Sequence, residues 1–214
     1  FDSDLTICSI VGIKKISDFT VSRMDTSPEK RVELHCHTKM SDMDGVSDTK
    51  SIVKQAHDWG HKAIAITDHG VMYGAVEFYN ALKAKGVKPI IGCEVYVARR
   101  SRLQKEGKFD SSGNHLVLLC KNEIGYRNLC YMVSMSFIDG FYSRPRIDME
   151  LLKEHHEGLI ALSGCLAGKI PQYILEGNVD EAENAFLKNN CPHIPTAAHI
   201  RIEKRGGGCV GRMS

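Results

Sequence analysis

The amino-acid sequence predicts an α/β fold built on a mainly parallel sheet, either closed into a barrel or open and doubly wound. Short apolar segments typical of strands alternate with amphipathic segments typical of helices, and the connections are short. One apolar segment, residues 63–66, has no polar face, as expected of a strand buried on both sides. A chain of 214 residues with 43% apolar content can bury one substantial core.

The first elements surround a pair of histidines. A short strand is expected at residues 32–34 and leads directly into His35 and His37. The helix that follows is expected to be capped by Ser47 and ended by Gly60. Its apolar face contains Ile52, Val53, Ala56 and Trp59.

The next elements repeat the alternation. The apolar strand at residues 63–66 ends in Asp68 and His69. A second helix is expected from about Gly74 to Gly86, and then a strand at residues 89–91 leads to Glu94. The apolar face of the second helix is expected to contain Val76, Tyr79 and Leu82.

The second half begins with a polar loop or lid, residues 99–113. The next expected elements are a strand at 116–119 and helices at 124–137 and 148–156. A strand at 159–162 then leads to Cys165. A last amphipathic helix is expected around Ala182, Ala185 and Phe186.

Charge and composition exclude several classes of protein. The formal net charge is only +2, so any nucleic-acid contact has to be local; the basic residues of the 99–113 segment offer either such a contact or a solvated loop. No apolar run approaches the roughly 18 residues of a membrane span, and the first residues lack a secretory signal pattern. Scattered cysteines, some inside apolar runs, favour free thiols in a reducing cytoplasm.

Metal-capable side chains follow several of the expected strands. In a parallel α/β fold the carboxyl ends of the strands lie on one face, so these side chains are expected to converge. His35 and His37 are two residues apart and therefore point to the same side of a strand. Imidazole pairs suit zinc-like or manganese-like ions. The set comprises His35, His37, His69, Glu94 and Cys165.

Three further residues, Asp44, Asp68 and His115, lie outside this set. Asp44 lies in a turn that can fold back over the first strand end, and Asp68 is either an outer partner that orients a histidine ring or a helix cap. His115 begins its strand and is expected on the opposite face. Because no P-loop, dinucleotide fingerprint or nucleophile elbow is present, a multi-metal hydrolytic site remains.

Several spaced motifs together resemble the PHP domain family, in particular the PHP region of bacterial DNA polymerase III α subunits. The motifs are RVELHCHTKMSDMDG at 31–45, ITDHG at 66–70, IGCEV at 91–95 and ALSGCLAG at 161–168. Residues 1–70 look like the PolC type, whereas the chain from residue 71 onward looks more like the DnaE type.

The resemblance implies a distorted (β/α)7 barrel with up to three bound divalent cations. By motif match, the ligands would be His35, His37, Asp44, His69, Glu94 and Cys165, with Asp68 as a catalytic residue. Zinc or manganese is expected, and magnesium is possible. Family members hydrolyse phosphoesters; in some replicative polymerases the domain trims DNA 3′ ends, and in others it only supports the polymerase.

The resemblance also divides the chain. Residues 1–30 are expected to be a linker or the end of a preceding oligonucleotide-binding domain, residues 31–190 the PHP domain, and residues 191–214 a tail outside the family. The Asp-x-His motif of the family is absent from the sequence, and His193 and His199 are its only nearby substitutes. A truncated or frameshifted product with an incomplete barrel is the resulting interpretation.

Three functions follow as hypotheses. The first is the PHP portion of a cytoplasmic DNA polymerase III α subunit with a 3′–5′ exonuclease-type site, whose partners are the primer 3′ end, the other polymerase domains and replisome subunits, but no membrane. The second is a stand-alone phosphatase of the histidinol-phosphatase type. The third is a scaffold with vestigial ligands.

Overall fold

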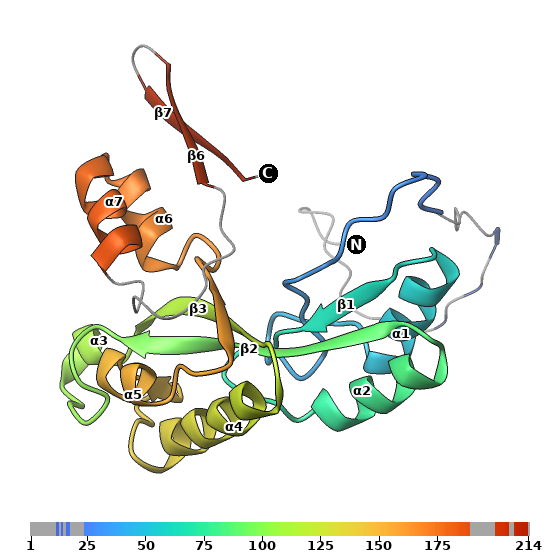
Figure 1. The fold of residues 1–214 in the computed structure, drawn as a ribbon, viewed down its shortest axis with the longest axis horizontal. Coiled ribbons are helices and arrows are strands. Elements are labelled where there is room, and N and C mark those ends of the chain that lie inside the picture. Colours follow the sequence, from blue (N-terminus) through green and yellow to red (C-terminus); the bar gives the residue numbers. More distant parts are fainter. Residues whose placement is uncertain are drawn as a thin grey trace.

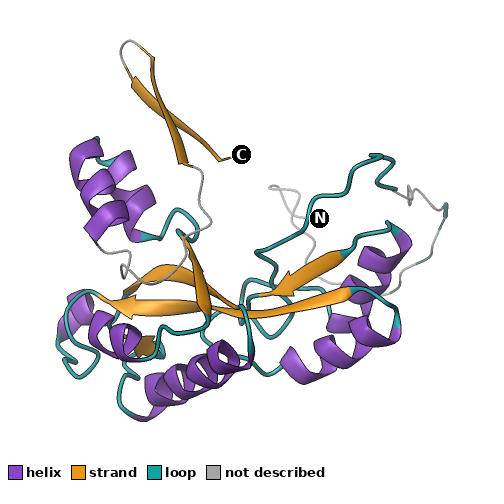
Figure 2. Cartoon of the chain, in the orientation of Figure 1, coloured by secondary structure: helices purple, strands orange, loops and turns teal. Residues whose placement is uncertain are grey.

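The computed structural model describes residues 24–188 as one continuous segment, together with residues 12, 14, 16–17, 200–205 and 208–213. A β sheet lies at the centre, with α1, α2, α4 and α5 on one side of it and α6 and α7 on the other (Figures 1 and 2). No helix within the described ranges is long and apolar enough to cross a membrane. Residues 193 and 199, the proposed substitutes for the missing motif, lie outside these ranges.

The sheet is mixed rather than parallel. Its main order is β1-β2-β3-β5, in which β1 runs parallel to β2, and β3 runs antiparallel to both β2 and β5. The short strand β4 pairs in parallel with the end of β2. The strands are β1 (Ala63–Ile66), β2 (Lys88–Ala98), β3 (Gly113–Cys120), β4 (Arg146–Ile147) and β5 (Leu159–Leu162).

The α/β fold class is confirmed, but the expectation of a parallel third strand is wrong. The segment between β2 and β3 contains only the four-residue helix α3 (Gly107–Asp110). A parallel neighbour needs a crossover, usually a full helix, whereas an antiparallel one does not. In the part of the chain that the structure describes, the sheet does not close into a barrel, in agreement with the expected incomplete barrel.

The helices begin and end where the sequence has capping residues, with some corrections. Asp48, not Ser47, caps α1 by accepting a hydrogen bond from the Ser51 amide at 2.7 Å. In α2 the buried face contains Phe78 and Leu82, whereas Val76 and Tyr79 are exposed. The helix α6 was not expected. The helices are α1 (Thr49–Asp58), α2 (Ala75–Ala84), α4 (Glu123–Ile138), α5 (Met149–Glu154), α6 (Lys169–Leu175) and α7 (Val179–Lys188).

The core is divided between the two faces of the sheet because side chains alternate along each strand. Leu118 of β3 packs with Leu129 and Met132 of α4 on one face. Val117 and Leu119, its neighbours in sequence, lie on the other face in a smaller cluster with Ala65. A third cluster packs β1 against α1 and α2.

One further expectation needs correction. Residues 32–34 do not form a regular strand; this extended segment contacts β1 through a single parallel bridge, Glu33 to Ile64. Near the end of the chain, the described residues from 200 onward form an antiparallel hairpin. Its strands are β6 (Ile200–Arg205) and β7 (Gly208–Met213).

Candidate metal centre

Glu94 occupies the middle of β2 and is 1% exposed. The expectation that Glu94 lies at a strand end is therefore wrong. Glu94 is nevertheless level with the end of β1, because His69 and Glu94 form a bridge just beyond the β1–β2 ladder. A buried carboxylate is costly unless hydrogen-bond donors or cations surround it. Here four histidines do so.

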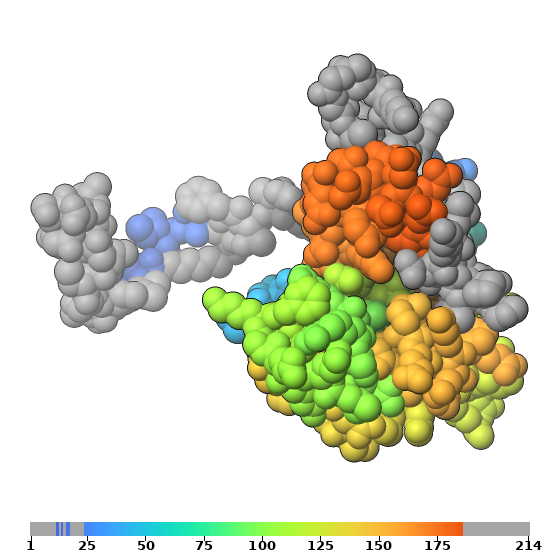
Figure 3. Space-filling model, turned by 90° about the vertical axis from the view of Figure 1, so that its left-hand side faces the viewer, coloured from blue at the N-terminus to red at the C-terminus, as the bar shows by residue number. Residues whose placement is uncertain are grey.

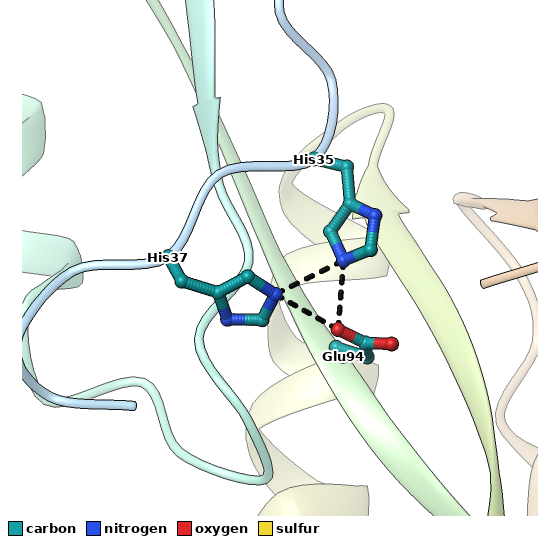
Figure 4. Close-up of side chains that lie close together, drawn as sticks. All are labelled: His35, His37 and Glu94. Atoms are coloured by element: carbon teal, nitrogen blue, oxygen red, sulfur yellow. Dashed lines mark hydrogen bonds and ion pairs between the residues drawn. The ribbon is translucent and has the colours of Figure 1, made fainter. Parts of the chain in front are cut away.

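Two of these histidines come from the segment that follows residue 34. The Nε2 atoms of His35 and His37 lie 2.7 and 2.9 Å from Oε2 of Glu94 (Figure 4). The same two nitrogens are only 3.0 Å apart. The predicted same-side arrangement is therefore present, although the segment is not a regular strand.

His69 and Asp44 extend the group. His69 Nε2 lies 2.8 Å from Oδ2 of Asp44, and His69 Nδ1 lies 3.5 Å from Oε2 of Glu94. Asp44 reaches this position because the turn at 38–45 folds back tightly. Gly45 allows that turn, since a Cβ atom there would lie 1.8 Å from the Thr38 carbonyl oxygen.

His115 is the residue that sequence reasoning misplaced. Its Nδ1 lies 3.0 Å from Oε1 of Glu94, on the same face as the other histidines. Because β3 is antiparallel, its first residues lie beside the later part of β2, where His115 pairs with Tyr96. The absence of an amphipathic helix between the two strands was the sequence signal for this arrangement.

Cys165 lies at the margin of the group. It follows β5, which runs parallel to β2, and its Sγ is 3.3 Å from Nδ1 of His115. Burial raises the pKa of this thiol, which opposes formation of the thiolate that binds metals.

Asp68 does not touch the histidine rings. Its carboxylate is 1% exposed and accepts hydrogen bonds from the Thr38 amide at 2.6 Å and the Ser41 hydroxyl at 2.7 Å. The helix-cap alternative is wrong, because α2 begins after Gly74. Asp68 instead anchors the 38–41 turn beneath the site.

Asp68 orients the ring of His37 indirectly, through the hydroxyl of Ser41. The only hydroxyl hydrogen of Ser41 is donated to Asp68, so its oxygen accepts from the ring of His37, whose Nδ1 is 2.7 Å away. A neutral His37 that donates through Nδ1 carries its lone pair on Nε2, which faces Glu94 and His35. Outer partners of metal-binding histidines have this effect.

The surroundings of Glu94 keep its carboxyl group ionised, as a ligand of a cation must be. Burial alone raises the pKa of Glu94, but the surrounding imidazoles of His115, His35 and His37 outweigh burial and hold the pKa well below its usual range. The hydrogen bond with Glu94 raises the pKa of His35, whereas burial lowers that of His69.

One buried atom tests the fit directly. His69 Nδ1 has no hydrogen-bond partner among the residues described, although it is buried. Two imidazole nitrogens 3.0 Å apart, as in His35 and His37, also repel unless a proton or a cation lies between them. Both features are explained by metal ligation, and the donors form three overlapping sets. These are His35, His37 and Glu94; His37, Asp44 and His69; and His69, Glu94 and His115.

A centre of this kind on an α/β sheet defines a metal-dependent class of protein, and sequence comparison identifies the family. The PHP domain family matches residues 33–191, and this chain belongs to it.

Relatives in this region are named DNA polymerase III subunit alpha. The protein of Chlamydia muridarum is 51% identical over 146 residues, which cover 68% of this chain and 12% of the relative. That of Thermus aquaticus is 49% identical over 181 residues, or 83% of this chain and 15% of the relative. The chain thus matches only 12–15% of the length of these relatives.

Among solved structures, a candidate metal-dependent phosphoesterase of Bifidobacterium adolescentis aligns with a TM-score of 0.36 and 14% identity. The alignment covers 74% of this chain and 54% of the other.

Proposed function

We propose that this chain is the PHP region of a bacterial replicative DNA polymerase III α subunit and that it contains a metal-dependent phosphoesterase site of the 3′–5′ exonuclease type. The observation that carries the proposal is the cluster of four histidines around the buried Glu94. The identity with polymerase relatives over the same residues supports the assignment.

The ligands proposed are His35, His37, Asp44, His69 and Glu94, to which the geometry adds His115. Cys165 is proposed as an outer ligand beside His115. The imidazoles favour zinc over magnesium, the carboxylates of Asp44 and Glu94 also suit manganese, and the three sets allow up to three cations. When bound, such cations lower the pKa of a water molecule and neutralise phosphate charge.

The chain's own residues have defined tasks in this proposal. Glu94 holds the imidazoles around one carboxylate, and Ser41 keeps the Nε2 lone pair of His37 directed into the site. Asp68, predicted to be catalytic, is proposed to act as a positioning residue beneath the turn. In the whole protein, the substrate would be a primer 3′ end in the cytoplasm, and other polymerase domains and replisome subunits would be neighbours.

The test combines metal content with hydrolysis. The purified chain is analysed by mass spectrometry for zinc and manganese, and then supplied with bis(p-nitrophenyl) phosphate, a 3′-labelled oligonucleotide and histidinol phosphate. We expect stoichiometric metal and cleavage of the oligonucleotide, with both lost in His35→Ala and kept in His57→Ala. His57 is the matched control because it is exposed on α1 and lies in none of the three sets.

The same experiment separates the alternatives. Preferred hydrolysis of histidinol phosphate would identify a small-ester phosphatase. Absence of metal, together with an unchanged melting temperature of His35→Ala, would identify a scaffold and overturn the proposal.

A further inference from the structure

The loop between β2 and β3 gathers positive charge that the candidate metal centre does not use. Residues 99–111 contain five cationic side chains and two carboxylates. Arg100 is paired with Asp110, and Arg102 is paired with Asp148 at 3.0 Å. The other three cations, Arg99, Lys105 and Lys108, have no carboxylate within ion-pair distance in the described part of the chain and are exposed.

An exposed aromatic ring lies among these cations. Phe109 is 52% exposed, and the guanidinium carbons of Arg99 and Arg100 lie 5.2 and 5.6 Å from its ring centroid. Burying a phenylalanine normally stabilises a protein, so an exposed ring beside two guanidinium groups indicates a contact surface. Aromatic rings flanked by cations bind single-stranded nucleic acids by base stacking and phosphate contacts.

The side chain of Arg146 anchors the loop to the rest of the molecule. The guanidinium of Arg146 is fully buried and donates to four backbone carbonyls, three of them in the loop at Arg102, Gln104 and Asp110, at 2.6–3.0 Å. Asp110 also accepts from the Glu106 amide at 3.0 Å. A preorganised surface loses less conformational entropy when it binds a ligand.

A cavity joins this loop to the candidate metal centre. It has a volume of about 510 Å³, and its lining includes both Arg99 and Arg100 of the loop and His115 of the candidate metal centre. Lys169 and Glu176 add one further cation and one carboxylate to its wall. Figures 1 and 3 show the α6–α7 pair above the part of the molecule that contains β3 and α3.

We infer that residues 99–111 form a binding surface for single-stranded nucleic acid. Arg99, Lys105 and Lys108 contact phosphates, an unpaired base stacks on Phe109, and the cavity leads the strand towards His115. A duplex fits less well, because its bases are already stacked and present no free face to the ring. Only the direction of the strand rests on the proposed function; the binding itself requires no metal.

The test measures binding without catalysis. A fluorescein-labelled 12-nucleotide single strand is titrated with the 214-residue chain in low salt and EDTA, and anisotropy is recorded. We expect Phe109→Leu to weaken binding roughly fivefold or more, because a stacking partner is lost while an apolar side chain remains. Arg99→Ala is expected to reduce the steepness of the salt dependence, since one phosphate contact is lost.

Lys83→Ala is the matched control, because Lys83 is an exposed cation in the last turn of α2, outside the loop and the cavity lining. It should leave affinity unchanged. The inference is overturned if the chain does not bind the strand, if Phe109→Leu binds normally, or if Lys83→Ala weakens binding as much as Arg99→Ala. Equal competition by polyglutamate would also overturn it, by showing that the loop selects acidic protein.

Binding by the His35→Ala variant in EDTA separates this inference from the proposed function. If this variant binds the single strand normally but does not hydrolyse it, the binding surface is supported independently of the metal centre.

Discussion

The hydroxyl of Ser41 links three parts of the candidate metal centre. It donates to Asp68, lies 2.7 Å from Nδ1 of His37 and accepts from the His69 amide at 3.1 Å. One small side chain thus fixes both a ring and a backbone position. Its importance is not visible in the composition of the turn, because it depends on contacts with residues 27 and 28 positions away.

Replacing Ser41 by alanine should therefore weaken metal binding without changing any proposed ligand. His37 would lose the acceptor that selects its tautomer, and loss of such outer partners typically lowers metal affinity about 10- to 100-fold. Competition with a chromophoric zinc chelator measures the effect. Ser134→Ala is the control, since Ser134 is exposed on α4 and donates only to the Cys130 carbonyl. Equal affinity in both variants would exclude the role of Ser41.

Asp148 shows a second kind of residue-scale effect, on stability. Its buried carboxylate caps α5 through the Leu151 amide and contacts Arg102. Burial raises the pKa of Asp148, but these hydrogen bonds and the charge of Arg102 outweigh burial and lower it. The stabilisation is therefore complete above the unfolded-state pKa of about 4 and is lost as the pH falls through the lower folded-state pKa.

Asp148→Asn should cost about 3 kcal/mol of unfolding free energy at pH 7, because a helix cap is weakened and Arg102 loses a buried partner. In urea titrations, the difference from the original chain should shrink as the pH is lowered below about 4. Glu150→Gln, an exposed neighbour on α5, should change stability by about 0.5 kcal/mol or less. A difference that stays constant with pH would contradict the assignment.

At the scale of elements, local sequence patterns predicted which helices and strands form better than they predicted how the strands pair. The buried strand β1, the ends of α1 and α2 at Gly60 and Gly86, and most later helices follow from apolar spacing and capping residues. The direction of β3 does not, because strand pairing is decided by contacts across the sheet. His115 was misplaced for that reason alone, whereas His35, His37, His69 and Glu94 were correctly expected to meet.

The loop at 99–111 is an element without regular structure that Arg146 holds in place. Replacing Arg146 by methionine would remove the donor that four backbone carbonyls share while roughly keeping side-chain length. The expected cost is roughly 3–5 kcal/mol of unfolding free energy, measured by urea titration. Arg127→Met, which removes an exposed pair with Glu123 on α4, should cost less than about 1 kcal/mol. Similar losses in the two variants would show that Arg146 does not anchor the loop.

At the scale of the whole molecule, the proposed ligands come from segments far apart in the chain. Asp44 lies in the turn before α1, Glu94 in β2 and His115 in β3, and the sheet that supports them is open among the described residues. Cations held by all three segments would tie the early part of the chain to the later part. Because metal binding stabilises the folded state in which these segments meet, an open sheet with exposed strand edges gains stability from such a link.

Metal removal should therefore destabilise the whole fold. With free zinc or manganese about 100-fold above the dissociation constant, binding adds about 2.7 kcal/mol, which raises the melting temperature by roughly 5–10 °C in a chain of this size. Calorimetry with EDTA and after metal is restored measures the shift. It should vanish in Glu94→Gln, where the central carboxylate is lost, and persist in His57→Ala. A melting temperature that is independent of metal would show that the histidine cluster is held together by protons and hydrogen bonds instead of cations.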